Sequence, residues 1–249
     1  MIFQYQDFKY YLDKTGIESS LFIAISGSHA YGWNRKDSDL DIRRVYFPNI
    51  QEVISSFFQA KPKKYKDNLV DVTEYPVSHF LKLLSKGNGN CLDNLFEEKL
   101  YEKSKIVKEL QEIVLENIHS GFIQHCLGFY SSLEKDMKNE TRLKRYGKEK
   151  LMLQSYKILM EGNILGVYKK VVYNIPRQLE YCEMKYCKEL LNNYLNYEKS
   201  TDNLLESCQN EIDFLKMSLL KILDETLSIK KSIIQIPLDR FLRNYYLGN

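Results

Sequence analysis

The hydrophobic pattern of the chain changes its period near residue 91. Before this point, three segments show the short apolar runs or the alternation of apolar and polar residues that is typical of β-strands: 20–27, 39–47 and 68–77. After it, apolar residues recur at helical spacing in long, lysine-rich segments, and strand patterns are nearly absent. Strands that come first and helices that follow predict an α+β chain with a helical extension.

The expected helices fill most of the remaining sequence. A first helix is predicted over 78–87, with Ser78 as its N-cap and Gly87 at its C-terminal end. An amphipathic helix is also predicted over 5–15, and a weak strand pattern covers 166–174. The further helical segments are 91–101, 104–118, 120–138, 143–162, 178–197 and 202–229. We therefore divide the chain into residues 1–100, which carry the strands, and residues 101–249, which are mainly helical.

Composition limits the class of protein. Lys and Arg number 36 against 33 Asp and Glu, a net charge of +3, so binding to nucleic acid would need a local basic patch. No stretch reaches the roughly 20 apolar residues that span a bilayer, and the N-terminal residues lack the apolar core of a signal peptide. The five cysteines form no CxxC pair, which argues against a disulfide framework or a structural zinc site. We expect a cytoplasmic protein with no membrane partner.

Two aspartates lie at the start of the second predicted strand. Asp39 and Asp41 are two residues apart, so in a strand they face the same side, about 6.5–7 Å apart along the chain, while Leu40 faces the core. Like charges at this spacing repel unless a cation lies between them. A pair of divalent ions about 3.5–4 Å apart fits such carboxylates and would stabilise a phosphoryl displacement. Oxygen ligands without nearby cysteine favour Mg²⁺ or Mn²⁺.

A Gly-Ser step ends the first predicted strand. Gly27 has no Cβ and lets a ligand approach the backbone, while Ser28 offers a hydroxyl group to a phosphate. Arg43 lies on the same strand face as Asp41. It could neutralise a phosphate or simply offset the two aspartates.

The third predicted strand supplies another carboxylate. Asp71 is flanked by two valines, and Glu74 faces the opposite side of the strand. We therefore predict that Asp71 is the third acid of a two-metal site.

A basic segment covers residues 135–150. Arg142, Lys144 and Arg145 surround Tyr146, a combination that suits a single-stranded nucleic-acid backbone and is equally compatible with a solvated helix face.

Just beyond the basic residues, Lys150, Gln154 and Lys157 share one face of the predicted helix. The ordinary interpretation of such lysines is a solvated helix face.

The order Gly27-Ser28, ten residues, Asp39-Leu40-Asp41 resembles the signature of the DNA polymerase β-like nucleotidyltransferase superfamily. The longer pattern "GSHAYG…SDLDIR", followed by "DVTEY…FLKLLSKGN", resembles the branch of predicted nucleotidyltransferases that is associated with RNA ligases and RNA repair. The resemblance covers residues 20–100.

The resemblance implies a small mixed β-sheet backed by helices, with a site for Mg²⁺ and an NTP in residues 1–100. It assigns metal binding and catalysis to Asp39, Asp41 and Asp71, and triphosphate contacts to Gly27 and Ser28. In two-domain members of the superfamily, a helical domain commonly supplies a lysine to the triphosphate. Lys150 and Lys157 are the candidates here.

We therefore predict a metal-dependent nucleotidyltransferase that moves a nucleoside monophosphate from an NTP to an acceptor hydroxyl, with an RNA 3′ end as the predicted acceptor. An RNA ligase is a candidate partner. One alternative is an antitoxin-like AMP transferase that modifies a protein or a small molecule. A second alternative is a non-catalytic protein that binds nucleotide or RNA on the same fold.

Overall fold

The computed structural model describes residues 20–54, 60–67, 69–97, 105–226 and 234–248. The predicted helix over 5–15 lies outside the described residues, and so does the predicted division at residue 100. Within these ranges, no helix is long and apolar enough to cross a membrane. All five cysteines are free.

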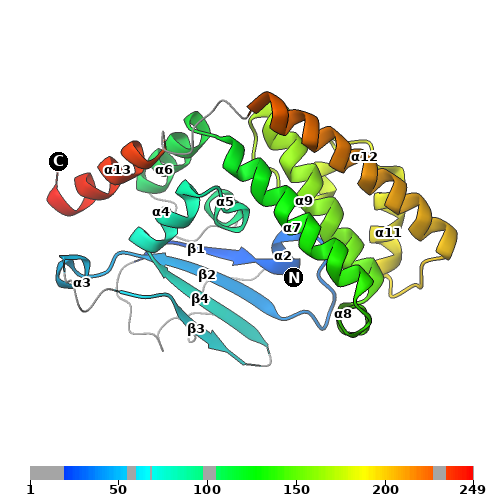
Figure 1. Ribbon diagram of the computed structural model, residues 1–249. Helices are drawn as coiled ribbons and strands as arrows, with labels where there is room; N and C mark the ends of the chain where they lie inside the picture. Colours follow the sequence, from blue (N-terminus) through cyan, green and yellow to red (C-terminus); the bar gives the residue numbers. More distant parts are fainter. Residues whose placement is uncertain (1–19, 55–59, 68, 98–104, 227–233, 249) are drawn as a thin grey trace.

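The sheet has four strands in the order β1-β2-β4-β3 (Figure 1). β1 pairs antiparallel with β2, β2 parallel with β4, and β3 antiparallel with β4, so the sheet is mixed as predicted. The strands are β1 (Ser20–Ser26), β2 (Leu40–Tyr46), β3 (Lys63–Lys66) and β4 (Val70–Pro76). The three predicted strands are confirmed, and β3 is an additional strand at the edge of the sheet.

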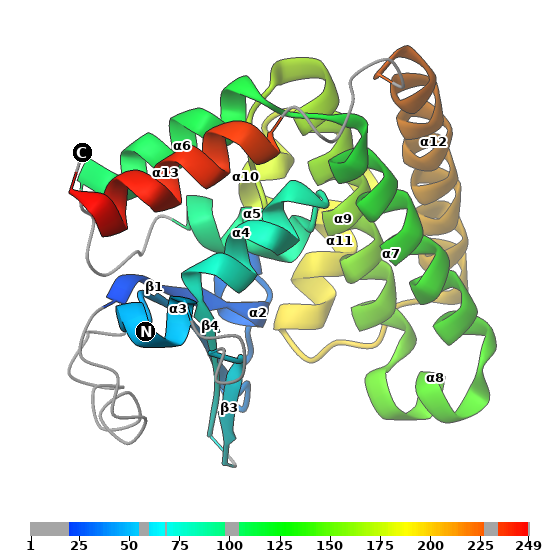
Figure 2. The same cartoon turned by 60° about the vertical axis from the view of Figure 1, so that its left-hand side comes forward.

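Helices make up the rest of the described fold (Figures 1 and 2). Those close to the sheet are α2 (Gly27–Tyr31), α3 (Ile50–Ile54), α4 (Val77–Ser85), α5 (Gly89–Phe96), α6 (Lys105–Glu116) and α13 (Gln235–Leu247). Those of the helical part are α7 (Ser120–Lys138), α8 (Glu140–Tyr146), α9 (Lys148–Tyr168), α10 (Ile175–Gln178), α11 (Lys185–Leu195) and α12 (Asp202–Thr226). The predicted α+β class with a helical extension is confirmed.

The two faces of the sheet bury different residues because side chains alternate along each strand. Phe22 and Val45 face α4, where Phe80 lies edge-on to Phe22 at 5.4 Å between ring centroids. On the opposite face, a second apolar cluster contains Ile23 and Ile42. This alternation fixes which polar side chains of the strands can meet.

An ion pair is buried between β2 and β4. Arg44 Nη1 and Glu74 Oε1 are 3.3 Å apart, and the two side chains are 6% and 1% exposed. Glu74 thus faces away from Asp71, as predicted.

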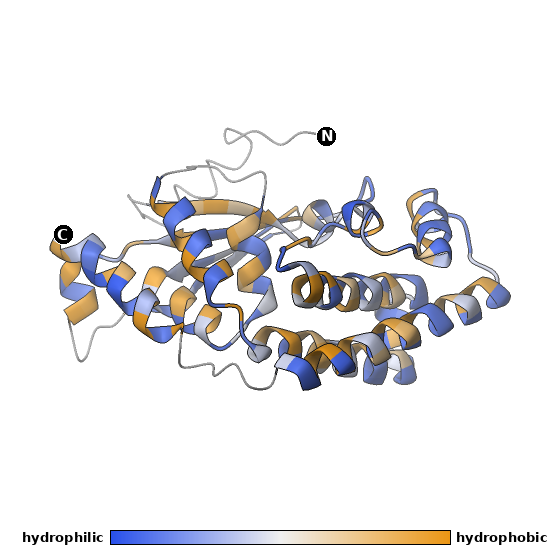
Figure 3. Cartoon of the chain, turned by 90° about the horizontal axis from the view of Figure 1, so that it is seen from above, coloured by the Kyte–Doolittle hydropathy of each residue, from blue (hydrophilic) through white to orange (hydrophobic). Residues whose placement is uncertain are grey.

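α9 is the central helix of the helical part and is buried along most of its length. Figure 3, which is coloured by hydropathy, shows helices packed side by side in this region. Leu219 and Ile222 of α12 lie against Gly162 and Gly166 of α9, where an added Cβ would be 2.9 Å from a Leu219 methyl carbon. These glycines allow α9 and α12 to pack closely, because neither carries a side chain that would separate the helices.

Several element predictions were wrong in part. The helix predicted over 178–197 is present only as α11, which begins at Lys185, and residues 179–184 are not helical. α4 begins at Val77, with Pro76 rather than Ser78 in the N-cap position. The predicted helix 143–162 is divided into α8 and α9 at Gly147, whose φ of +79° a glycine adopts without strain. The weak strand pattern over 166–174 is the end of α9 followed by an irregular segment.

Candidate functional site

Three polar side chains lie in a row across neighbouring strands at one end of the sheet. Ser26 of β1 is the register partner of Asp41 of β2, and Asp41 is the partner of Asp71 of β4. Because β2 and β4 are parallel and in register, both carboxylates project from the same face. The side chains of Asp41 and Asp71 are 22% and 25% exposed, so a ligand can reach them.

Two cations hold the carboxylates together. Arg43 Nη2 lies 3.1 Å from Asp41 Oδ1, and Arg43 Nη1 lies 3.3 Å from Asp71 Oδ1. Lys66 Nζ lies 3.4 Å from Asp71 Oδ2 and 3.5 Å from Asp39 Oδ2. Of the two roles considered for Arg43, the geometry is that of a cation offsetting aspartates, although its partners are Asp41 and Asp71 rather than Asp39 and Asp41.

The protonation of Asp41 reflects this environment. Partial burial raises the pKa of the Asp41 carboxyl above its ordinary value. Arg43 opposes this shift, while the charges of Asp39 and Asp71 add to it. A further cation near these three carboxylates would therefore favour the ionised form of Asp41.

Gly27 lies directly against Asp41. Its φ is +62°, and an added Cβ would be 2.8 Å from Asp41 Cγ. A side chain at this position would therefore displace the carboxylate. Ser28 follows in α2 and is half-buried. The Gly-Ser step and the Asp-x-Asp pair thus meet at one point, as the motif predicts.

The donor set fits a hard divalent cation in its chemistry, because Asp39, Asp41 and Asp71 offer only carboxylate oxygens. In the described part of the chain, no group of three or more His, Cys, Asp or Glu side chains is arranged so that it could hold a metal ion. Lys66 links Asp39 with Asp71, and Arg43 links Asp71 with Asp41. A divalent ion bound to all three carboxylates would compete with Lys66 for Asp39 and Asp71.

Lys157 is buried among charged and aromatic side chains. It is 4% exposed and forms ion pairs with Asp93 of α5 and Glu161 of α9. Its ammonium nitrogen also lies 4.5 Å from the ring centroid of Tyr31. Burial alone would lower the pKa of Lys157, but the two carboxylates outweigh it and raise the pKa well above the ordinary value. The interpretation of Lys157 as part of a solvated face is therefore wrong, and its role toward the triphosphate stays a prediction.

Lys150 is half-exposed in the first turn of α9, and its predicted role stays a prediction. The basic residues Arg142, Lys144 and Arg145 are exposed on α8. The side chains of α8 contact one another: Arg142 Nη1 donates to the Tyr146 hydroxyl at 3.3 Å, and the Arg145 guanidinium lies 5.2 Å from the Tyr146 ring centroid.

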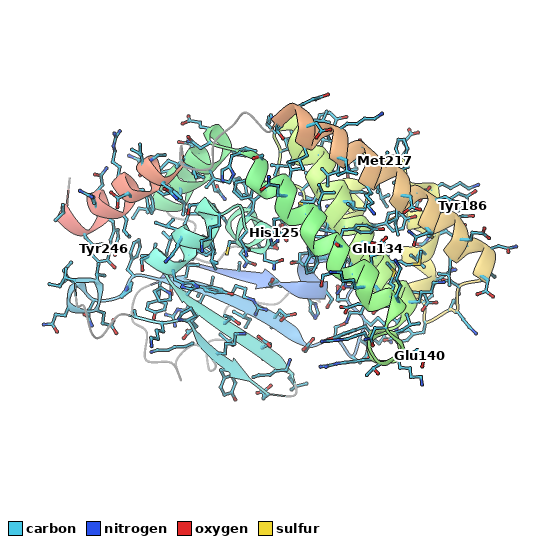
Figure 4. The ribbon with its side chains drawn as sticks, viewed as in Figure 1. His125, Glu134, Glu140, Tyr186, Met217 and Tyr246 are labelled. Carbon is cyan, nitrogen blue, oxygen red and sulfur yellow. The ribbon has the colours of Figure 1, made fainter. Side chains whose placement is uncertain are left out.

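α8 lies at the tip of the helical part, well separated from β3 and β4 in Figure 2. Figure 4 shows Glu140, the first residue of α8, at the same tip. The structure therefore does not bring the basic residues of α8 next to the carboxylates.

The loop between the Gly-Ser step and the Asp-x-Asp pair is held by the helical part, a feature that the sequence patterns missed. Arg35 Nε donates to the Tyr194 carbonyl oxygen at 2.7 Å, and its guanidinium lies 3.6 Å from the Tyr194 ring centroid. The Tyr197 hydroxyl donates to Asp37 at 3.1 Å. These partners are about 160 residues apart in sequence, so no local pattern could have revealed them.

A cavity of about 280 Å³ lies beside α2. Its lining includes His29 and Ala30 of α2, together with Tyr173, Asn174 and Arg177. His29 directly follows Ser28, so the cavity adjoins the Gly-Ser step. Its aromatic and hydrogen-bonding side chains suit a nucleoside.

Comparison with known proteins agrees with this geometry. Residues 14–181 match the model of the RNA repair pathway DNA polymerase beta family. The uncharacterized protein MJ0002 of Methanocaldococcus jannaschii is 25% identical over 150 residues, which cover 59% of this chain and 60% of that protein. The chain thus matches less than two thirds of the length of this relative.

A solved structure, the nucleotidyltransferase-like protein from Exiguobacterium sibiricum, aligns with 98% of this chain and 80% of its own. Its sequence identity is 11% and its TM-score is 0.32, so this alignment adds nothing to the assignment. The family match covers more than half of the sequence and includes the Gly-Ser step, the Asp-x-Asp pair and Asp71. The chain therefore belongs to the RNA repair pathway DNA polymerase beta family.

Proposed function

We propose that the chain is a metal-dependent nucleotidyltransferase that transfers a nucleoside monophosphate from an NTP to the 3′-hydroxyl of RNA. The observation that carries the proposal is the in-register placement of Asp41 and Asp71 on parallel strands, with Gly27 against the Asp41 carboxylate. The family membership supports the reaction class and the setting of RNA repair. An RNA ligase is the proposed partner, because an extended 3′-hydroxyl end is a substrate for strand joining.

Different residues of the site would bind the nucleotide and the metal ions. Gly27 and Ser28 would lie along the triphosphate, and the cavity beside His29 would take the nucleoside. Asp39, Asp41 and Asp71 would hold Mg²⁺ or Mn²⁺, which supplies charge neutralisation at the phosphates and at the attacking oxygen. Arg43 would keep Asp41 and Asp71 side by side through its two ion pairs.

At the α-phosphorus, the reaction forms one bond and breaks one. The acceptor oxygen bonds to the α-phosphorus, the bond from that phosphorus to the bridging oxygen breaks, and pyrophosphate leaves. Asp71 would take the proton of the hydroxyl group, because it lies on the side of Asp41 away from the Gly-Ser step. Positioning and charge neutralisation supply most of the rate in such transfers.

The test supplies each α-labelled NTP, Mg²⁺, and matched RNAs that end in a 3′-hydroxyl or a 3′-phosphate. We expect label only on the 3′-hydroxyl RNA, and we expect Asp41→Asn to abolish it. Asp239→Asn is the matched control, because Asp239 is an exposed aspartate of α13 that pairs with Arg243. Label on a protein or a small molecule would favour the antitoxin-like alternative. NTP or RNA binding without transfer to any acceptor would favour the non-catalytic alternative.

A further inference from the structure

The edge strand β3 is basic and lies next to the carboxylates. The segment that ends with it, "KPKKYK" (61–66), carries four lysines, all exposed. β3 pairs with β4, the strand of Asp71, and its other edge has no neighbouring strand in the described sheet. A band of positive charge therefore borders the acidic site on the side away from β1.

The lysines of this segment divide between the two faces of the sheet. Lys64 is the register partner of Thr73 and Lys66 is the partner of Asp71, so both face the carboxylates. The contacts of Lys66 with Asp39 and Asp71 agree with this orientation. Tyr65, between them, packs against the apolar cluster on the opposite face, and Lys63 faces that side by alternation.

We propose that Lys64 and Lys66 bind the backbone phosphates of a single-stranded RNA acceptor as its 3′ end approaches Asp71. This inference rests on the proposed function and names the path of its acceptor. The strand order gives the direction: Gly27 and Ser28 follow β1 on one side of Asp41, and Asp71 and β3 lie on the other. With the nucleotide on the β1 side, the β3 side is left for the acceptor.

The charges of β3 suit a polynucleotide better than a small acceptor. Single-stranded nucleic acids are bound largely by cations that follow the backbone, with little dependence on sequence. Lys66 pairs with Asp39 and Asp71 in the structure. Neutralising these carboxylates with a divalent ion would release its ammonium group for a phosphate, so RNA should bind more tightly with Mg²⁺ than with EDTA.

The lysines of β3 could instead only prevent the edge of the sheet from pairing with other chains, and this role predicts a different result. Exposed edge strands often carry lysines that prevent pairing with other chains. That role depends on charge along the edge and applies to Lys61 and Lys63 as much as to Lys64 and Lys66. An RNA path along the carboxylate face requires only the second pair, so the two pairs form a matched comparison.

The test measures binding of a short 5′-labelled single-stranded RNA by fluorescence anisotropy, with Mg²⁺ and without NTP, over a series of salt concentrations. We expect Lys64→Gln with Lys66→Gln to weaken binding about tenfold and to lower the salt slope by about 1.4, since each single-strand phosphate contact contributes roughly 0.7. Lys61→Gln with Lys63→Gln removes the same charge and should leave both quantities near wild type. Equal affinity in all proteins, or equal loss in both variants, would overturn the proposal.

Crosslinking locates the RNA end independently of affinity. An RNA with a 3′-terminal 4-thiouridine should crosslink to β3 or β4, and crosslinks confined to α8 would overturn the proposed path. Binding and crosslinking need no NTP, so they can succeed even if transfer fails. The converse result is a Lys64/Lys66 variant that transfers to RNA at the wild-type rate and binds RNA with wild-type affinity. That result would leave the proposed function standing and reject this surface.

Discussion

Replacing Gly27 by alanine tests whether the Gly-Ser step and the Asp-x-Asp pair form one site. An alanine at φ +62° costs about 1–2 kcal/mol, because its Cβ crowds the backbone in this region. The Cβ would also lie 2.8 Å from Asp41 Cγ, so the carboxylate must turn away and lose its 3.1 Å contact with Arg43. This half-exposed ion pair adds at most about 1 kcal/mol. The variant should therefore fold, with a free energy of unfolding lower by about 1–3 kcal/mol.

Gly147→Ala is the matched control. Gly147 has a φ of +79°, and an added Cβ would meet no atom within 4 Å. Gly147→Ala should therefore show a backbone cost alone, about 1–3 kcal/mol at its φ of +79° and ψ of +142°, or a decrease in Tm of roughly 2–12 °C for a chain of this size.

The two variants should differ in their response to ligand. Mg²⁺ with an NTP at about 100 times Kd stabilises a binding protein by about 2.7 kcal/mol, or roughly 5–11 °C in Tm. We expect this increase in the wild type and in Gly147→Ala, and little or none in Gly27→Ala, which should also lose transfer. Thermal unfolding with and without Mg²⁺ and NTP measures it. Equal ligand stabilisation in both variants would refute the link between Gly27 and the nucleotide site.

Three further outcomes follow from the site and its surroundings. Asp71→Asn should keep NTP binding but lower the single-turnover rate of transfer by about 10²–10⁴-fold, and a near-normal rate would exclude Asp71 as proton acceptor. Lys157→Met leaves two carboxylates buried without their cation and should lower the free energy of unfolding in urea by about 3–5 kcal/mol, whereas Lys157→Arg should cost less. Arg43→Gln removes the charge that lowers the pKa of Asp41, so the acid limb of the pH–transfer profile should move to higher pH. An unmoved acid limb would show that another group controls it.

The sequence predicted the strands where the side-chain pattern is strong. β1, β2 and β4 are each seven residues long and carry buried apolar residues on at least one face. β3 was missed because it has four residues, three of them lysine, and only Tyr65 packs against an apolar cluster. An edge strand takes its conformation from its neighbour, so its own sequence need not show the pattern.

The candidate site was predicted in part for a similar reason. The alternation of side chains along a strand was enough to prefer Asp71 over Glu74 as the third acid. The buried Arg44–Glu74 ion pair agrees with that choice. The burial of Lys157 could not be predicted in the same way. One partner, Glu161, is four residues away on the same helix, but the other, Asp93, is 64 residues away on α5.

The position of α2 depends on the helical part as well as on the sheet. Asn174 Nδ2 donates to the Ala30 carbonyl oxygen at 2.9 Å, and Lys157 lies against the Tyr31 ring. Gly32, which ends α2, has a φ of +85°, and an added Cβ would be 2.8 Å from Pro176 Cδ. All of these partners lie beyond residue 100, so residues 1–100 alone would lose every one of these contacts around the Gly-Ser step. We infer that the helical part is needed to position Gly27 and Ser28, because a five-residue helix is too short to hold its own conformation.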